Sequence, residues 1–212
     1  MKHLVIIGVG GFGREVFCHA KGSMGYGIDW DIKGFLDGDV LLSPKEYEKL
    51  QAPVLGDIFS YSVESDDVFI CAIADPKTKE RLVGIVQSRG GSFINLIHNT
   101  ALLEGNIKLG IGNIFAPHVI LTDCIRIGNF VSFNIGCNIG HDVEIGDYSS
   151  FMGRVIICGF ASIGRRVFMG TYAVAVPHAT IQDDVYIGVG SVAMKRIRAG
   201  KTVFGNPAMP ID

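Results

Sequence analysis

Charge is scarce in this sequence, and neither sign dominates. Only 19% of the 212 residues are Asp, Glu, Lys or Arg, and the formal net charge is -2. Proteins that bind nucleic acid or an anionic membrane along a broad surface usually carry an excess of basic residues. We therefore expect neither as a partner, whereas a local site can still hold a small acidic ligand.

Long hydrophobic runs and cysteine motifs are also missing. The opening segment, MKHLVIIGVGG, is too short an apolar run for a signal peptide, and no other span approaches membrane length. The five cysteines are odd in number and scattered without CxxC spacing, which is typical of reduced thiols. These absences predict a cytoplasmic protein without membrane insertion.

The first part of the chain alternates strand and helix patterns. We expect strands at 4–7, 30–36 and 68–73 and helices at 14–21, 44–50 and 76–88. This alternation is typical of an open parallel sheet whose ligand crevice lies at the carboxyl ends of the strands. Residues 1–92 are therefore predicted to form a small α/β domain of Rossmann-like type.

A glycine turn follows the first expected strand. Its sequence, Gly8-Val-Gly10-Gly11-Phe-Gly13, matches GxGxxG, in which glycines let the backbone approach a phosphate at a helix N-terminus. Asp37 ends the second strand, where a carboxylate can accept hydrogen bonds from a ribose or a base. Only about ninety residues precede the six-residue repeat, which is small for a domain that binds a dinucleotide. A domain of this size is better suited to one nucleotide diphosphate. A tight turn without a ligand is the competing interpretation.

A six-residue period governs the second part of the chain. Residues two places before the bulky ones, from Ala101 to Ser191, are small or β-branched almost throughout. This period predicts a parallel solenoid over residues 93–212, with one hexapeptide per side of a prism and 18 residues per coil. Glycines after the bulky residues are expected to ease the corners. The bulky positions are Ile97, Leu103, Leu109, Phe115, Leu121, Ile127, Phe133, Ile139, Ile145, Phe151, Ile157, Ile163, Met169, Ala175, Ile181, Ile187 and Ala193.

One corner of the expected prism carries candidate catalytic groups. His141 stands two residues after Ile139 and next to Asp142, so its imidazole points outward and suits a general base. Gly159 occupies the same corner one coil later, where its N–H can face an oxyanion. A solvated turn histidine and a plain corner glycine are the alternatives. Because the solenoid histidines lack a short spacing, no metal site is expected.

Five motifs resemble one family. They are the opening IIGVGGFGREV, the GFLDGD after the second strand, the Ala74-Asp75-Pro76 turn, the NIGCNIGHD stretch and the closing GNPA. Together they resemble the hexapeptide-repeat acyltransferases with a left-handed parallel β-helix, and more narrowly the PglD/NeuD-like sugar acetyltransferases. The resemblance implies transfer from acetyl-CoA to the amino group of a nucleotide-linked sugar in surface-glycan synthesis. It also implies a homotrimer with coenzyme A between neighbouring prisms.

The resemblance assigns roles to individual residues. His141 is expected to act as general base, oriented by Asp142, with direct transfer and no acyl-enzyme. Asn134 is expected near the acceptor, and coenzyme A near Gly159 and Lys195. The nucleotide is expected at Gly10, Gly11, Phe12, Gly13 and Asp37.

Two departures from the family leave the acceptor open. Phe12 stands where the best-known members have histidine, and Ser150 stands where many members carry a second histidine. A sugar O-acetyltransferase of the sialic acid type is one alternative. A trimeric scaffold that binds a nucleotide sugar without catalysis is the other.

Overall fold

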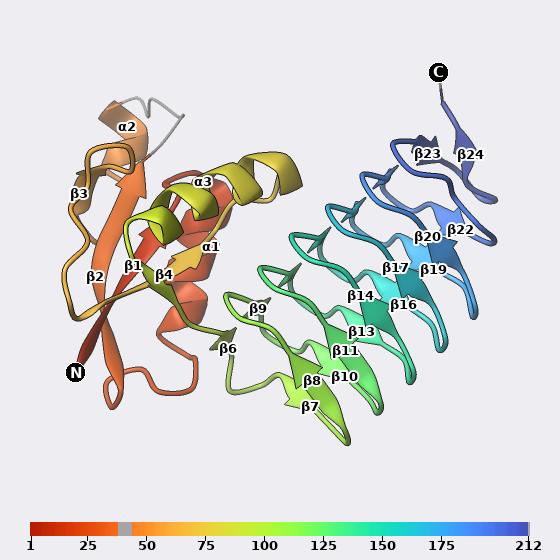
Figure 1. Ribbon diagram of the computed structural model, residues 1–212, viewed down its shortest axis with the longest axis horizontal. Helices are drawn as coiled ribbons and strands as arrows, with labels where there is room; N and C mark the ends of the chain where they lie inside the picture. Colours follow the sequence, from red (N-terminus) through yellow and green to blue (C-terminus); the bar gives the residue numbers. More distant parts are fainter. Residues whose placement is uncertain (38–43, 212) are drawn as a thin grey trace. The chain divides into compact units, whose positions relative to one another are not determined.

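The chain forms two compact units, Met1–Asn99 and Thr100–Asp212 (Figure 1). The structure is a computed structural model that describes residues 1–37 and 44–211. Gly38 and Asp39 of the GFLDGD motif therefore lie outside the described residues. Within the described ranges, no helix has the length and apolar character needed to cross a membrane.

The first unit contains a parallel sheet with the strand order β3-β2-β1-β4-β5. The predicted alternation of strands and helices is confirmed, but two short strands, β3 and β5, were not predicted. β5 pairs with β4, so the expected boundary at residues 92 and 93 cuts through this sheet. The strands are β1 (Lys2–Ile7), β2 (Trp30–Asp37), β3 (Val54–Asp57), β4 (Asp67–Cys71), β5 (Ser92–Phe93) and β6 (Leu96–Ile97), and β6 is not part of this sheet. The helices are α1 (Gly11–Ala20), α2 (Pro44–Tyr47) and α3 (Pro76–Ser88).

Local sequence explains these elements. The LVII run of β1 is fully buried, as expected for a central strand covered on both faces. α3 begins where the Asp75 carboxylate accepts a hydrogen bond from the N–H of Thr78 at 2.8 Å, with Pro76 in the first turn. This capped helix packs on β4 and helps to hold the sheet.

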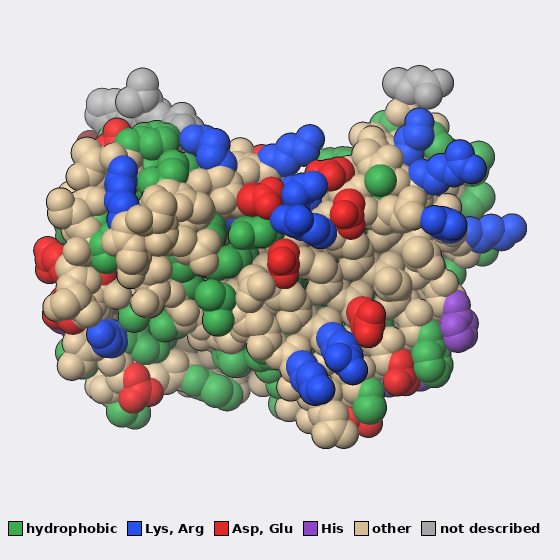
Figure 2. All heavy atoms as spheres, viewed as in Figure 1, with side chains coloured by type: hydrophobic (Ala, Val, Ile, Leu, Met, Phe, Trp, Pro, Cys, Tyr) green, Lys and Arg blue, Asp and Glu red, His purple; other side chains and the backbone are tan. Residues whose placement is uncertain are grey.

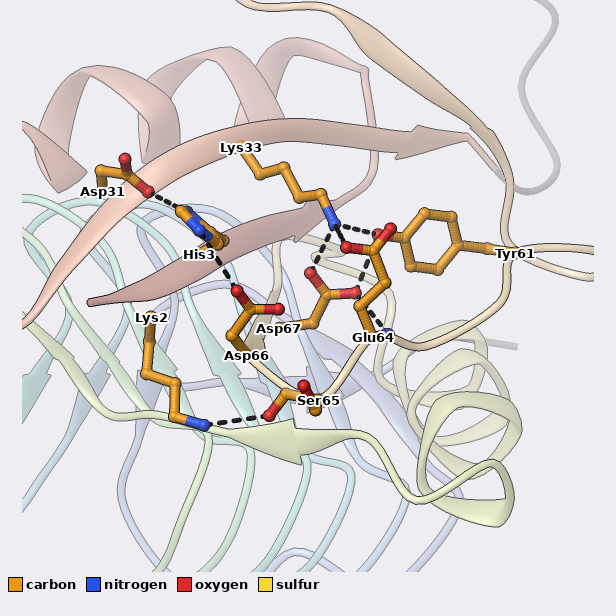
Figure 3. A network of polar contacts seen from close by, with 9 residues as sticks. All are labelled: Lys2, His3, Asp31, Lys33, Tyr61, Glu64, Ser65, Asp66 and Asp67. Atoms are coloured by element: carbon orange, nitrogen blue, oxygen red, sulfur yellow. Dashed lines mark hydrogen bonds and ion pairs between the residues drawn. The ribbon is translucent and has the colours of Figure 1, made fainter.

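A polar network ties β2 to the segment that leads into β4 (Figure 3). The ammonium group of Lys33 donates to Asp67 at 2.8 Å and to the hydroxyl of Tyr61 at 3.0 Å. It also pairs with Glu64 at 2.9 Å. Burial alone would raise the pKa of Asp67, but the hydrogen bond from Lys33 and further donors lower it below its usual value. Since Asp67 stays ionised, the network acts as an internal ion pair that fixes this end of the sheet.

The second unit is a three-sided parallel β-helix, visible in Figure 1 as a stack of coils. Strand pairing joins residues 18 apart, as Ile139 pairs with Leu121 and with Ile157, which confirms the predicted coil length. Face one contains β7 (Leu102–Leu103), β10 (Ile120–Leu121), β13 (Asn138–Ile139), β16 (Ile156–Ile157), β19 (Val174–Ala175) and β22 (Val192–Ala193). Face two contains β8 (Ile107–Leu109), β11 (Ile125–Ile127), β14 (Glu144–Ile145), β17 (Ser162–Ile163) and β20 (Thr180–Ile181). Face three contains β9 (Ile114–Phe115), β12 (Ser132–Phe133), β15 (Ser150–Phe151), β18 (Phe168–Met169), β21 (Tyr186–Ile187), β23 (Thr202–Phe204) and β24 (Met209–Pro210).

Both periodic registers of the sequence point into the prism. The rings of Phe115, Phe133 and Phe151 stack in one column at centroid distances of 5.2 and 5.1 Å. A polar residue of the second register bonds between coils, since the oxygen of the buried Asn113 side chain accepts a hydrogen bond from the N–H of Val131 at 2.8 Å. Equivalent side chains of successive coils therefore stack to fill the core, and the Asn113 oxygen keeps a hydrogen-bond partner.

The corner glycines serve a different purpose from the one expected. From Leu109 to Ile187, the left-handed backbone conformation falls three residues after each bulky position, where non-glycine residues such as Tyr148, with φ of 61°, usually stand. The glycine directly after the bulky residue instead allows close stacking. At Gly146, a Cβ atom would lie 2.7 Å from the backbone nitrogen of Arg165 in the next coil. The expectation that these glycines ease the turn is wrong, because it is contact between coils that demands them.

Candidate functional site

His141 stands on the edge between face one and face two, here called the His141 edge. Its Nδ1 lies 2.9 Å from the carboxylate of Asp142, and both side chains are about half exposed, at 57% and 45%. Because a carboxylate can only accept, this contact places the proton on Nδ1. The lone pair of Nε2 is then directed away from Asp142 and can take a proton from a ligand.

Gly159 lies directly beside the imidazole. A Cβ atom on Gly159 would be 2.8 Å from Cε1 and 2.9 Å from Nε2 of His141, so the ring occupies the space that a side chain would need. The Gly159 N–H has no acceptor among the residues that the structure describes. The structure thus brings a proton acceptor and an available amide donor together, as the 18-residue spacing predicted.

An aromatic ladder continues the same edge beyond Gly159. The ring of Phe160 meets the His141 ring edge-on, with centroids 5.0 Å apart and an interplanar angle of 88°. Phe160 then stacks on His178 at 4.9 Å and 5°. Sequence analysis missed this ladder, although the 18-residue spacing from Asp142 through Phe160 and His178 to Arg196 could have shown it.

The edge ends in a basic cavity of about 760 Å³ near the C-terminus. Lys195 lies there, in the same corner column as His141 and three coils further on. At roughly 4.8 Å per coil this places it about 14 Å along the prism. Figure 2 shows Lys and Arg side chains gathered around this end of the molecule. The basic lining residues are Lys195, Arg196, Arg198 and Lys201, and the apolar ones include Met194, Ile197, Val203 and Met209.

A polar hollow of about 300 Å³ lies on the other side of His141, toward the first coils. Asp142 forms part of its wall together with the exposed thiol of Cys124. Outward side chains of face two complete it with both signs of charge, from Lys108, Arg126 and Glu144. The catalytic candidate therefore sits between a mixed-charge hollow and the aromatic ladder.

Asn134 lies on a different edge. It follows β12 at the corner between face three and face one, here called the Asn134 edge, and its side chain accepts a hydrogen bond from the N–H of Ile135 at 2.6 Å. Within the chain, Asn134 and His141 therefore stand on different edges of the prism. Ser150, at the place of the second family histidine, is fully buried, with its Oγ 3.2 Å from that of Ser132.

The expected nucleotide-binding residues gather at the carboxyl edge of the first sheet. The N–H of Gly8 donates to the carbonyl oxygen of Leu36 at 2.8 Å, which places the glycine turn beside Asp37 at the end of β2. A Cβ atom on Gly10 would meet nothing within 4 Å, so this backbone is open to a ligand. A Cβ atom on Gly13 would collide with the carbonyl oxygen of Gly8, so this glycine permits helix packing.

Neighbouring residues add charge that sequence analysis did not include. Gly11 is exposed and Phe12 is half-buried at the start of α1. A small pocket of about 220 Å³ lies along this helix and includes Arg14 and Lys49, with the rings of Phe17 and Phe35. The two cations of this pocket suit an anionic ligand. Lys49 has no sequence motif of its own, so only the fold could reveal it.

Solved structures share this architecture over the whole chain. The acetyltransferase domain of PglB from Neisseria gonorrhoeae FA1090 matches with a TM-score of 0.88 and 24% identity, covering 100% of both chains. PerB from Caulobacter crescentus, solved with CoA and GDP-perosamine, matches with a TM-score of 0.86 and 24% identity, covering 100% of this chain and 98% of that one. The fold is thus a left-handed parallel β-helix that follows a Rossmann-like sheet in the sequence.

Comparison with related sequences shows the family to which this chain belongs. The PglD N-terminal domain model matches residues 3–86. GDP-perosamine N-acetyltransferase of Escherichia coli O157:H7 is 30% identical over 213 residues, covering 96% of this chain and 93% of that protein. The chain belongs to the PglD-like sugar acetyltransferases, acetyl-CoA-dependent enzymes of the hexapeptide-repeat type.

Proposed function

We propose that this chain transfers the acetyl group of acetyl-CoA to the amino group of a nucleotide-linked sugar for surface-glycan synthesis. The observation that carries the proposal is the cluster on the His141 edge. There a carboxylate-oriented imidazole lies against an amide donor, at the distances given above. The named activity of the Escherichia coli relative supports an amine acceptor.

In the proposed reaction, the sugar amine attacks the carbonyl carbon of the thioester. Nε2 of His141 removes a proton from the amine as the N–C bond forms, and the Gly159 N–H donates to the carbonyl oxygen as it becomes negative. The C–S bond then breaks, and the leaving thiolate receives the proton from His141. Asp142 holds the imidazole in one tautomer throughout.

The cysteines support direct transfer to the sugar. Cys124 is the thiol that lines the hollow beside Asp142. Loss of hydration and the neighbouring charge of Asp123 raise the pKa of Cys124, so it stays protonated near neutral pH. Burial raises the pKa of Cys137 to about 12. Neither thiol is therefore a good nucleophile, and no acyl-enzyme is needed.

The edge beyond His141 offers a path for coenzyme A. Its pantetheine arm is expected to follow the ladder from Gly159, and its phosphates to reach the basic cavity at Lys195. The cations of this cavity suit phosphates, and its methionines suit a flat base. This path assigns cofactor binding to Gly159 and Lys195.

The first unit is expected to hold the nucleotide. The open backbone at Gly10 and Gly11 and the N-terminus of α1 suit a diphosphate, while Asp37 suits a ribose or base. Phe12 and Gly13 complete the turn. The sugar amine would reach His141 from the hollow beside Asp142, where Glu144 adds a second acceptor for an ammonium group or hydroxyls.

A homotrimer would complete the site. Face one presents apolar side chains outward, with Leu102 at 51% and Ile156 at 41% exposure, whereas face two presents Arg126 and Glu144. Face one is flanked by both the His141 edge and the Asn134 edge. A second copy packed on it can therefore bring Asn134 of one protomer to His141 of another. The free cysteines agree with a cytoplasmic enzyme.

An acceptor panel tests the proposal. UDP-, dTDP- and GDP-linked amino sugars, with GDP-perosamine first, are each incubated with acetyl-CoA while thiol release is followed. The proposal predicts release with at least one amino sugar and an amide-linked product. Acetylation of hydroxy sugars instead would favour an O-acetyltransferase, and nucleotide-sugar binding without any acetyl-CoA binding would favour a scaffold.

A further inference from the structure

We propose that Phe160 is a positioning residue that holds the imidazole of His141 in its reactive orientation. The inference rests on the proposed role of His141 as general base. Among the residues that the structure describes, the imidazole of His141 has one hydrogen bond to restrain it, to Asp142, and both side chains are about half exposed. A single hydrogen bond to an adjacent exposed residue leaves rotation about the side chain weakly restricted.

The other restraints on the ring come from the next coil. Gly159 lies under the face of the imidazole, and Phe160 forms a wall at its edge, with centroids 5.0 Å apart at 88°. Such edge-to-face contacts are the preferred geometry of ring pairs, and each contributes roughly 0.5–1.5 kcal/mol beyond area burial. Asp142, Gly159 and Phe160 thus enclose the ring on three sides.

Phe160 is itself held in place. Its ring stacks on His178 at 4.9 Å, and its N–H donates to the carbonyl oxygen of His141 at 3.0 Å. The backbones of Phe160 and His141 are therefore hydrogen-bonded to each other. Movement of one coil relative to the other would break this bond.

The exposure of Phe160 argues against a purely structural role. Half of its surface, 50%, is accessible, so its ring is not part of the core. The equivalent corner residues one and two coils earlier on this edge are Asp142 and Cys124, which are not aromatic. Phe160 is therefore the first aromatic residue of this column, and it lies in the coil that contacts the His141 ring.

Tyr148 provides a matched comparison on the third edge, between face two and face three. It has the same left-handed corner conformation and stacks on Phe130 at 5.2 Å and 10°. It stands on a different edge from His141, Asp142 and Gly159. Tyr148→Leu therefore removes a comparable stacked ring without disturbing His141.

Steady-state kinetics test the inference. Phe160→Leu should lower kcat about tenfold or more, because a catalytic group displaced by about 1 Å can lose a large part of its rate. The KM value for the acceptor should change less than about twofold, since the hollow proposed for the acceptor does not include Phe160. Phe160→Tyr should restore most of kcat, and Tyr148→Leu should leave kcat unchanged. Unchanged kcat in Phe160→Leu, a change confined to KM, or an equal loss in Tyr148→Leu would overturn the inference.

A second readout needs no turnover. Long-range ¹H–¹⁵N spectra of the histidine rings, assigned with His141→Asn, should show the Nδ1–H tautomer of His141 in the wild type and a tautomer mixture in Phe160→Leu. An unchanged tautomer population in the variant would contradict the positioning role. Wild-type protein inactive toward every acceptor would defeat the proposed function while leaving this spectroscopic test of Phe160 intact.

Discussion

Lys79 links the stability of the first unit to pH. Its side chain is 1% exposed, and burial lowers its pKa to about 7 despite the nearby Cys71 and Asp75. In the unfolded chain its pKa returns to 10.5. Between these values the unfolded state binds the extra proton, so this residue makes the folded state more stable as pH rises from 7 to 10.5 and less stable as pH falls.

Urea unfolding of the wild type and Lys79→Met checks this prediction. We expect the wild type to gain stability relative to the variant between pH 7 and pH 9.5, by several kcal/mol at about 1.4 kcal/mol per pKa unit. Below pH 7 the difference should level off. Parallel pH profiles for the two proteins would show that the Lys79 amine does not titrate in this range.

At the scale of the element, the strand pairs of the prism depend on glycine for contact between coils. Gly146→Ala should destabilise the second unit by about 1–3 kcal/mol, because the new Cβ meets backbone atoms of the next coil. Gly136→Asn is the matched control. Gly136 has a left-handed φ of 70°, but a Cβ there would have only the Arg154 side chain at 3.4 Å. Equal losses of melting temperature in both variants would contradict this distinction.

The elements were largely predictable from the sequence because their signals are local and repeated. The six-residue period defined the coil, and Asp75-Pro76 defined the start of α3. β3 and β5 were missed because VLGD is half polar and β5 is two residues long. The placement of His141 and Gly159 on the same corner, one coil apart, was predicted from their 18-residue spacing alone. The ladder at Phe160 was missed although the same spacing contains it. The pocket of Lys49 could not be found in this way, since it depends on neighbours distant in sequence.

At the scale of the whole molecule, face one is the surface on which the proposed trimer depends. Ile156→Arg places a charge at its centre, where burial against a second copy would leave that charge unpaired. We expect a folded monomer by light scattering and loss of acetyl transfer. Ser162→Arg, on the neighbouring face two, should stay trimeric and active. A trimeric, fully active Ile156→Arg would exclude face one as the interface.

The general-base role of His141 is the central claim, and acetyl-CoA turnover by His141→Asn tests it most directly. Thiol release is measured at saturating acetyl-CoA and acceptor, with coenzyme A affinity measured by calorimetry as the control for an intact site. The account predicts a fall in kcat of about 10²–10⁴-fold, typical for loss of a general base, with the affinity for coenzyme A unchanged. Turnover equal to that of the wild type would contradict it.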